Sequence, residues 1–147
     1  MAVCCKCSFD SLPKGTEKVL RHGWCHTGDL ACSDQHEYIK ITGRVKELII
    51  RGGENIASVE VEEVVTQHPA VLDSAVVGAP HEELGEAPVV FVVPEDQASF
   101  ELDDFLDYCA KHLVRYNVPA EVMVTDAIPR PGSGKTMRLK LREQLLH

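Results

Sequence analysis

Apolar and polar positions along the chain predict a small domain of short strands and three helices. Residues 37–42 (EYIKIT) alternate apolar and polar side chains, as a half-buried strand does, and residues 45–50 (VKELII) form a second apolar run. Further strands are expected in two valine-rich runs bounded by prolines and in a third run near the C-terminus, at residues 71–80, 87–95 and 120–129. Between the early runs, residues 51–56 (RGGENI) are expected to form a loop, because paired glycines admit backbone conformations closed to other residues.

Helical periodicity appears at residues 58–69, 99–116 and 136–146. Ser58 is the candidate N-cap of the first helix, and His68-Pro69 ends it. Helices that follow strands in this order favour an α+β fold, with a small mixed or antiparallel sheet flanked by helices. The second helix carries an apolar stripe at i, i+3, i+4, i+7 and i+11, formed by Leu102, Phe105, Leu106, Cys109 and Leu113.

The composition narrows the function. The chain has 147 residues, 44% of them hydrophobic and 26% charged, and its net charge of −8 disfavours nucleic acid as a partner. No apolar run approaches the roughly 20 residues of a membrane span, and the first ten residues lack the apolar core of a secretory signal. We expect an intracellular protein, with the cytoplasm favoured and the mitochondrion and peroxisome left open.

The chain has six cysteines, and five of them are clustered within residues 4–32 rather than spread through the chain, so we expect reduced thiols. Cys4 and Cys7 form one CxxC pair, which His22, His26 or His36 could complete as a zinc site. A zinc ribbon requires a second such pair and the sequence has none, so we expect no bound metal.

The stretch PRPGSGKT (129–136) resembles a phosphate-binding loop of the form GxxxxGK[ST]. Pro129 stands where the first glycine should be, and no chain follows to form the strand with the metal-binding acid. What remains is Lys135 on a glycine-flanked turn, either a solvated lysine or a mobile cation for a phosphate or carboxylate.

Four stretches that follow one another along the chain favour a functional role for Lys135 over a merely solvated lysine. They are GWCHTGDL (23–30), ITGRVKELIIRGGENI (41–56), VVGAPHEELGEAPVVFVV (76–93) and PRPGSGKTMR (129–138). Together they resemble the C-terminal part of the adenylate-forming superfamily, which includes acyl- and aryl-CoA ligases, luciferases and peptide-synthetase adenylation domains. RGGENI is most similar to the CoA ligases.

The resemblance implies a role for five residues. Asp29 matches the acid that binds the ribose hydroxyls of ATP or AMP, and Arg44 a second nucleotide contact. Lys46 matches the hinge about which the small domain rotates, and Gly53 a glycine beside the pantetheine channel of CoA. Lys135 matches the lysine that bridges the substrate carboxylate and the α-phosphate, where an ammonium stabilises the charge of the transition state.

The resemblance also implies a domain organisation. Residues 1–43 are expected to be an irregular N-terminus plus the tail of a large AMP-binding domain, and residues 44–147 the C-terminal domain. The family's acyl pocket, phosphate loop and metal-binding glutamate are not in this sequence, so ATP, Mg²⁺ and CoA would bind the full enzyme and none would bind this chain tightly. We expect the C-terminal portion of a carboxylic acid–CoA ligase, inactive alone, whose partner is the large domain. The alternative is a stand-alone binding or regulatory module that docks on a large domain in trans.

Overall fold

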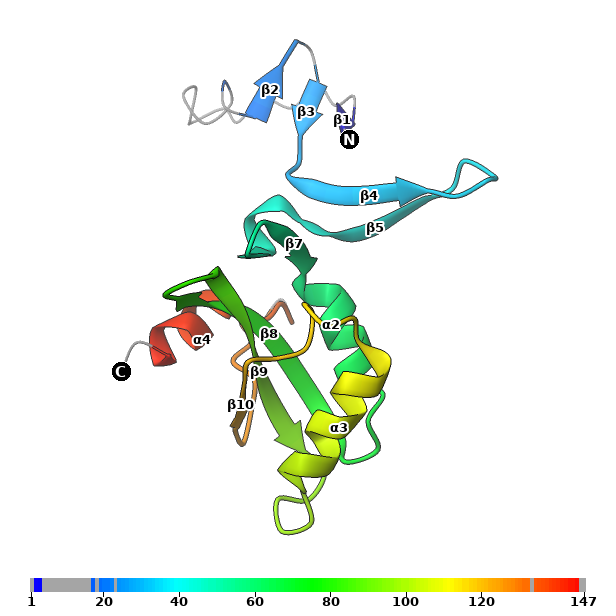
Figure 1. Cartoon of the computed structure of the whole chain (residues 1–147). Coiled ribbons are helices and arrows are strands. Elements are labelled where there is room, and N and C mark those ends of the chain that lie inside the picture. Colours follow the sequence, from blue (N-terminus) through cyan, green and yellow to red (C-terminus); the bar gives the residue numbers. More distant parts are fainter. Residues whose placement is uncertain (1, 4–16, 18, 23, 133, 146–147) are drawn as a thin grey trace. The chain divides into compact units, whose positions relative to one another are not determined.

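The computed structural model of the chain describes residues 2–3, 17, 19–22, 24–132 and 134–145 (Figure 1). It divides into two compact units, residues 1–46 and 47–147, which are taken in turn. The domain boundary expected after Gly43 falls inside a strand of the first unit and stays a prediction.

The first unit is built from short antiparallel strands. A three-stranded sheet has the order β1-β3-β2, and a separate ribbon pairs β4 with β5. The tight turn of this ribbon is held by the carboxylate of Asp34, which accepts hydrogen bonds from the backbone N–H groups of His36 and Tyr38 at 2.8 and 3.0 Å. The strands are β1 (Ala2–Val3), β2 (Leu20–Arg21), β3 (Trp24–His26), β4 (Asp29–Ser33) and β5 (Ile39–Arg44).

The second unit contains a five-stranded mixed sheet, which confirms the α+β fold class. Its centre is a long antiparallel hairpin of β8 (Val71–His81) and β9 (Gly85–Pro94). The short strand β10 (Glu121–Val124) lies parallel to β9. A second hairpin, β6 (Leu48–Arg51) with β7 (Glu54–Ala57), joins the other end of β9 through the pair Arg51 and Gly85.

Helices cover both faces of this sheet (Figure 1). The helices α2 (Ser58–Val65) and α3 (Leu102–His112) pack on one face, and α4 (Arg138–Gln144) packs on the other. Alternate residues of β9 serve the two cores, which explains why its valines form a continuous apolar run rather than an alternating one. None of the described helices is long and apolar enough to cross a membrane.

The core under α2 and α3 contains Phe105 and Cys109, both fully buried. Burial raises the pKa of the Cys109 thiol to about 11, so it stays protonated as an apolar packing group. The predicted stripe is wrong at its first position, since Leu102 is 46% exposed. That residue begins α3 and is not part of the core cluster, which Phe105 and Cys109 of the following turns enter.

Two local predictions need correction. Residues 54–56 of the expected loop belong to strand β7 and Arg51 ends strand β6, so RGGENI contains the turn of a hairpin and parts of both its strands. Ser58 is the first helical residue and not the N-cap; its hydroxyl donates instead to the backbone oxygen of Glu47 at 2.8 Å. The position before it, Ala57, offers no side-chain cap.

Candidate functional site

The two predicted nucleotide contacts lie side by side at one end of the β4–β5 ribbon. Register places Asp29 opposite Arg44, and the Nε of Arg44 lies 2.8 Å from Oδ1 of Asp29. The backbone N–H of Asp29 donates to the hydroxyl of Thr27 at 3.2 Å. An exposed ion pair of this kind contributes about 0–1 kcal/mol, so the two groups can separate at little cost when a ligand binds.

Lys46, the predicted hinge, lies between two anchored neighbours. It is exposed, sits within the short 3₁₀ turn η1 (Val45–Glu47) and is the last residue of the first unit. On one side the N–H of Val45 donates to the backbone oxygen of Gly28 at 2.8 Å, inside the first unit. On the other side Glu47 is bonded to residues of the second unit, including Ser58. Rotation about the backbone of Lys46 would therefore leave the bonds on both sides intact.

Gly53 forms the tip of the β6–β7 hairpin together with Gly52. Their φ angles are +92° and +58°, the positive pair that a two-residue type I′ turn requires. A Cβ on Gly53 would meet no atom within 4 Å, so its surroundings in the second unit are open. The glycine is required here by backbone conformation and leaves a flat, uncovered turn at the surface.

Lys135 projects from the loop between β10 and α4 and is exposed. Two backbone bonds shape the loop: the N–H of Gly134 donates to the oxygen of Pro131 at 2.9 Å, and the N–H of Met137 donates to that of Pro129 at 2.8 Å. Gly134 has φ +76°, which places its residue in the left-handed region just before the lysine. Lys135 therefore lies on a turn that contains a glycine, as the sequence predicts.

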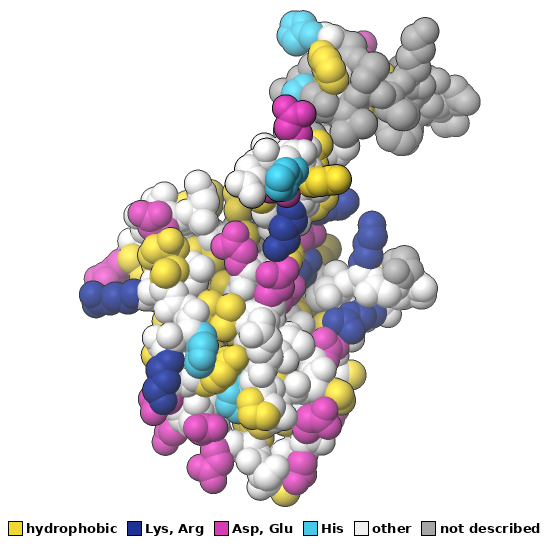
Figure 2. Space-filling view, turned by 90° about the vertical axis from the view of Figure 1, so that its right-hand side faces the viewer, with side chains coloured by type: hydrophobic (Ala, Val, Ile, Leu, Met, Phe, Trp, Pro, Cys, Tyr) yellow, Lys and Arg dark blue, Asp and Glu magenta, His cyan; other side chains and the backbone are white. Residues whose placement is uncertain are grey.

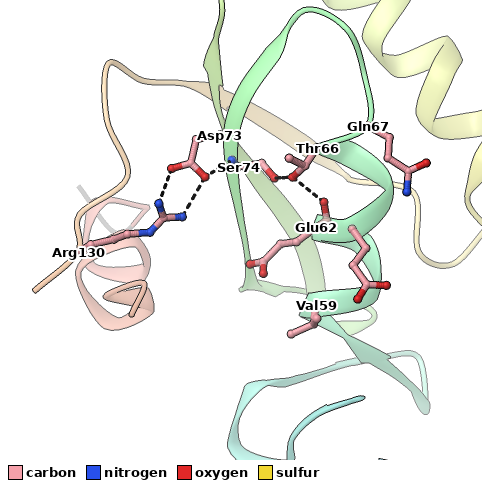
Figure 3. A pocket seen from close by; sticks show the side chains of 8 residues that line it. Val59, Glu62, Thr66, Gln67, Asp73, Ser74 and Arg130 are labelled. Atoms are coloured by element: carbon pink, nitrogen blue, oxygen red, sulfur yellow. Dashed lines mark hydrogen bonds and ion pairs between the residues drawn. The ribbon is translucent and has the colours of Figure 1, made fainter. Parts of the chain in front are cut away.

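An arginine at the start of the loop binds a carboxylate of β8. Both terminal nitrogens of Arg130 contact Asp73 at 2.9 Å, as Figure 3 shows. The pair borders a cleft of about 460 Å³ beside α2, whose other lining residues include Thr66 and Ser74, joined hydroxyl to hydroxyl at 2.9 Å. The Arg130–Asp73 pair ties the loop to β8, and the Thr66–Ser74 bond ties the end of α2 to the same strand.

A second arginine at the end of the loop binds two carboxylates, and the sequence analysis missed this cluster. Arg138 contacts Glu62 of α2 and Glu47 of η1. Burial raises the pKa of Glu62, although its hydrogen bond from the backbone of Val76 and the charge of Arg138 both act to lower it. The only signal in the sequence is the position of Arg138, three residues after Lys135, within a basic stretch that resembles any solvated helix face.

Elsewhere the second unit shows no single dominant charge on the face in Figure 2, where acidic and basic side chains of the described residues are interspersed. Three of the cysteines, Cys25, Cys32 and Cys109, are free thiols. The zinc possibility depended on Cys4 and Cys7, which lie outside the described residues.

Comparison with known proteins then decides the family. A family model for the AMP-binding enzyme C-terminal domain matches residues 60–135. The chain belongs to this family. The resemblance to adenylate-forming enzymes is thereby confirmed.

Relatives of this AMP-binding C-terminal domain are much longer proteins. YngI of Bacillus subtilis (strain 168) is 44% identical over 132 residues, covering 89% of this chain and 24% of YngI. The long-chain-fatty-acid–CoA ligase of Yersinia pestis is 42% identical over 132 residues, covering 90% of this chain and 23% of the ligase. The chain thus spans about a quarter of the length of the curated relatives it matches.

A solved structure of the family agrees in fold. O-succinylbenzoate coenzyme A synthetase (MenE) from Bacillus subtilis, in complex with ATP and magnesium ion, has a TM-score of 0.79 and 36% identity, covering 87% of this chain and 26% of MenE. Enzymes of the family use ATP, Mg²⁺ and CoA. Among the residues that the structure describes here, no group of three or more His, Cys, Asp or Glu side chains is placed to hold a metal ion.

Proposed function

We propose that this AMP-binding C-terminal domain supplies the hinge and the adenylation lysine of an ATP-dependent carboxylic acid–CoA ligase. The observation that carries the proposal is the similarity of about nine-tenths of the chain to proteins that are named CoA ligases or CoA synthetases. About three quarters of such an enzyme would lie in a large domain, joined in cis or docked in trans. That domain would contribute the acyl pocket and the phosphate loop.

In the proposed adenylation step, the substrate carboxylate attacks the α-phosphate of ATP and pyrophosphate leaves. The ammonium of Lys135 would meet the charge that gathers on the carboxylate and phosphate oxygens. An exposed lysine on a turn that contains a left-handed glycine suits delivery to a site outside the second unit. The Asp29–Arg44 pair would bind the ribose, since a carboxylate can accept hydrogen bonds from both hydroxyls of a vicinal diol.

In the proposed second step, the thiol of CoA attacks the acyl-adenylate and AMP leaves. Rotation at Lys46 would withdraw Lys135 and bring the β6–β7 hairpin to the CoA channel. The uncovered tip at Gly53 supports this assignment, because a turn without side chains leaves room for the pantetheine arm.

The experiment uses a two-domain enzyme in which this chain replaces the C-terminal part of the Yersinia pestis ligase, assayed with a long-chain fatty acid. Lys135→Ala should lower the rate of fatty-acid-dependent pyrophosphate exchange by at least about 100-fold, because a group that stabilises the charge of the transition state is lost. Thioester formation from supplied acyl-adenylate should change little. Lys140→Ala is the matched control, since Lys140 is an exposed lysine on the adjacent helix. Equal loss of both half-reactions in Lys135→Ala would contradict the assigned role.

A further inference from the structure

We propose that Arg138 is a positioning residue that ties the segment leaving the hinge to the loop that carries Lys135. The inference rests on the proposed function and deepens it. It concerns how rotation at the hinge reaches the lysine, and it assigns this to one side chain in the second unit.

The contacts of Arg138 are short and reach two carboxylates. Its Nη1 donates to Oε2 of Glu47 at 2.7 Å, and its Nη2 donates to both carboxylate oxygens of Glu62 at 2.9 Å. The carboxylate of Glu62 also accepts the backbone N–H of Val76 at 2.7 Å. One guanidinium therefore joins η1, α2 and α4, and through Glu62 it reaches strand β8.

Burial distinguishes this cluster from ordinary surface ion pairs. The side chains of Arg138, Glu47 and Glu62 are 20%, 32% and 18% exposed. Screening by solvent is weak at such sites, and two carboxylates this close would repel each other without the cation between them. The partners lie 91 and 76 residues before Arg138 in the sequence, so the cluster ties together distant segments of the chain.

Arg138 and Glu47 each lie close in sequence to a residue with a proposed role. Glu47 is the first residue after the hinge Lys46, and its backbone oxygen is also held by Ser58. Arg138 follows Lys135 by three residues and directly follows Met137, whose N–H closes the loop onto Pro129. The bond between Arg138 and Glu47 thus links the end of the hinge to the end of the lysine loop.

This link has a mechanical consequence. If Glu47 were free, a change of backbone angle at Lys46 could be absorbed by flexing of η1. With Glu47 bound to the start of α4, the loop must turn with the backbone that leaves the hinge. Misplacement of a catalytic group by about 1 Å can cost on the order of 100-fold in rate, so loosening this link should be visible in kinetics.

The test uses the same two-domain enzyme. Arg138→Gln should lower kcat for pyrophosphate exchange by about 10- to 100-fold with little change in KM for ATP, while thioester formation from supplied acyl-adenylate falls much less. Arg138→Lys should recover part of the loss, because an ammonium keeps the charge but lacks the separate, coplanar nitrogens with which the guanidinium reaches both carboxylates. Arg142→Gln is the control: Arg142 lies on the same helix, and its contact with Glu86 is longer, at 3.7 Å, and more exposed.

Glu47→Gln serves as a second variant in case Arg138→Gln does not fold. It should disturb the fold less, since Glu47 is the more exposed partner and an amide oxygen still accepts one hydrogen bond. It should show the same selective loss, on a smaller scale. The double variant should lose no more than Arg138→Gln alone, because both changes break one link. Losses that multiply, or equal losses in both half-reactions, would overturn the coupling.

A readout without catalysis separates this inference from the proposed function. In the 147-residue chain, Arg138→Gln should speed hydrogen exchange at the amides of Gly134 and Met137, and Arg142→Gln should not. If Lys135→Ala leaves pyrophosphate exchange intact, the proposed function fails whatever this readout shows. If Lys135→Ala acts as expected but Arg138→Gln changes neither the exchange of these amides nor kcat, the positioning role alone is refuted.

Discussion

Replacing Gly53 by alanine tests the reasoning about the β6–β7 turn, because the structure separates two effects of the added methyl group. The φ of Gly53 is +92°, a conformation that disfavours a Cβ, but the space around the position is open. Within the second unit the substitution therefore costs backbone strain and no clash. The expected loss in free energy of unfolding is about 1–2 kcal/mol.

Urea unfolding of the 147-residue chain measures this loss. With a typical dependence of about 1–3 kcal/mol per molar urea, the midpoint should fall by on the order of 0.5–1 M. Gly132→Ala is the matched control, since Gly132 also faces open space but its φ is not positive. Its midpoint should stay within the equivalent of about 0.5 kcal/mol. A Gly53→Ala variant as stable as the wild-type chain would refute the strain account.

The functional arm compares Gly53→Ala with Gly52→Asn in the two-domain enzyme. Asparagine is favoured at the first position of a type I′ turn, and a Cβ on Gly52 would meet Leu84 at an ordinary contact distance of 3.5 Å. If Gly53 faces the CoA channel, Gly53→Ala should slow the thioester half-reaction more than the adenylation half-reaction. Gly52→Asn should leave the ratio of the two near that of the parent. Equal slowing of both steps by Gly53→Ala would remove Gly53 from the channel.

Two further predictions concern the stability of the 147-residue chain. Phe105→Ala should lower the free energy of unfolding by about 3–5 kcal/mol, measured by urea unfolding, because Phe105 is fully buried and contacts the rings of His68 and Phe100; a loss below about 1 kcal/mol would mean that the site collapses or is loosely packed. Burial raises the pKa of Glu62 above its ordinary 4.5, so its contribution to stability is present below pH 4.5 and is lost as pH rises through the raised pKa. Glu62→Gln lacks this titration, so its stability relative to wild type should rise between pH 4 and 7; a relative fall would show that the Arg138 pair outweighs burial.

Much of the second unit could be predicted from local sequence. The density of valines in β8 and β9 and the prolines that bound these runs are visible in the sequence without knowledge of any partner strand. The stripe of α3 is visible for the same kind of reason, because Phe105 and Cys109 are one helical turn apart and both enter the core. The motifs around Asp29, Gly53 and Lys135 were enough to predict the family that the comparisons confirm.

Predictions from local sequence were wrong at Ser58, in β7 and at Leu102. The sequence predicts Ser58 as an N-cap because its hydroxyl could accept a hydrogen bond from a free backbone N–H of α2. In the structure this hydroxyl instead donates to the backbone oxygen of Glu47 in η1. The four residues of β7 are too few to show alternation, so the glycine pair alone dominated the prediction of a loop. Leu102 satisfies the helical period but lies before the turn at which α3 meets the sheet.

The sequence by itself predicted most strands and helices of the second unit, and it suggested candidate residues for the proposed site. Only the tertiary structure decided which charges meet. The register of β4 and β5 pairs Asp29 with Arg44. The tertiary fold also brings Arg138 to Glu62 and Glu47, although α2 and α4 pack on opposite faces of one sheet. Charged residues carry no periodic signal for their distant partners, since their positions fit a solvated helix face equally well, so such clusters emerge only when the sheet fixes the distances between elements.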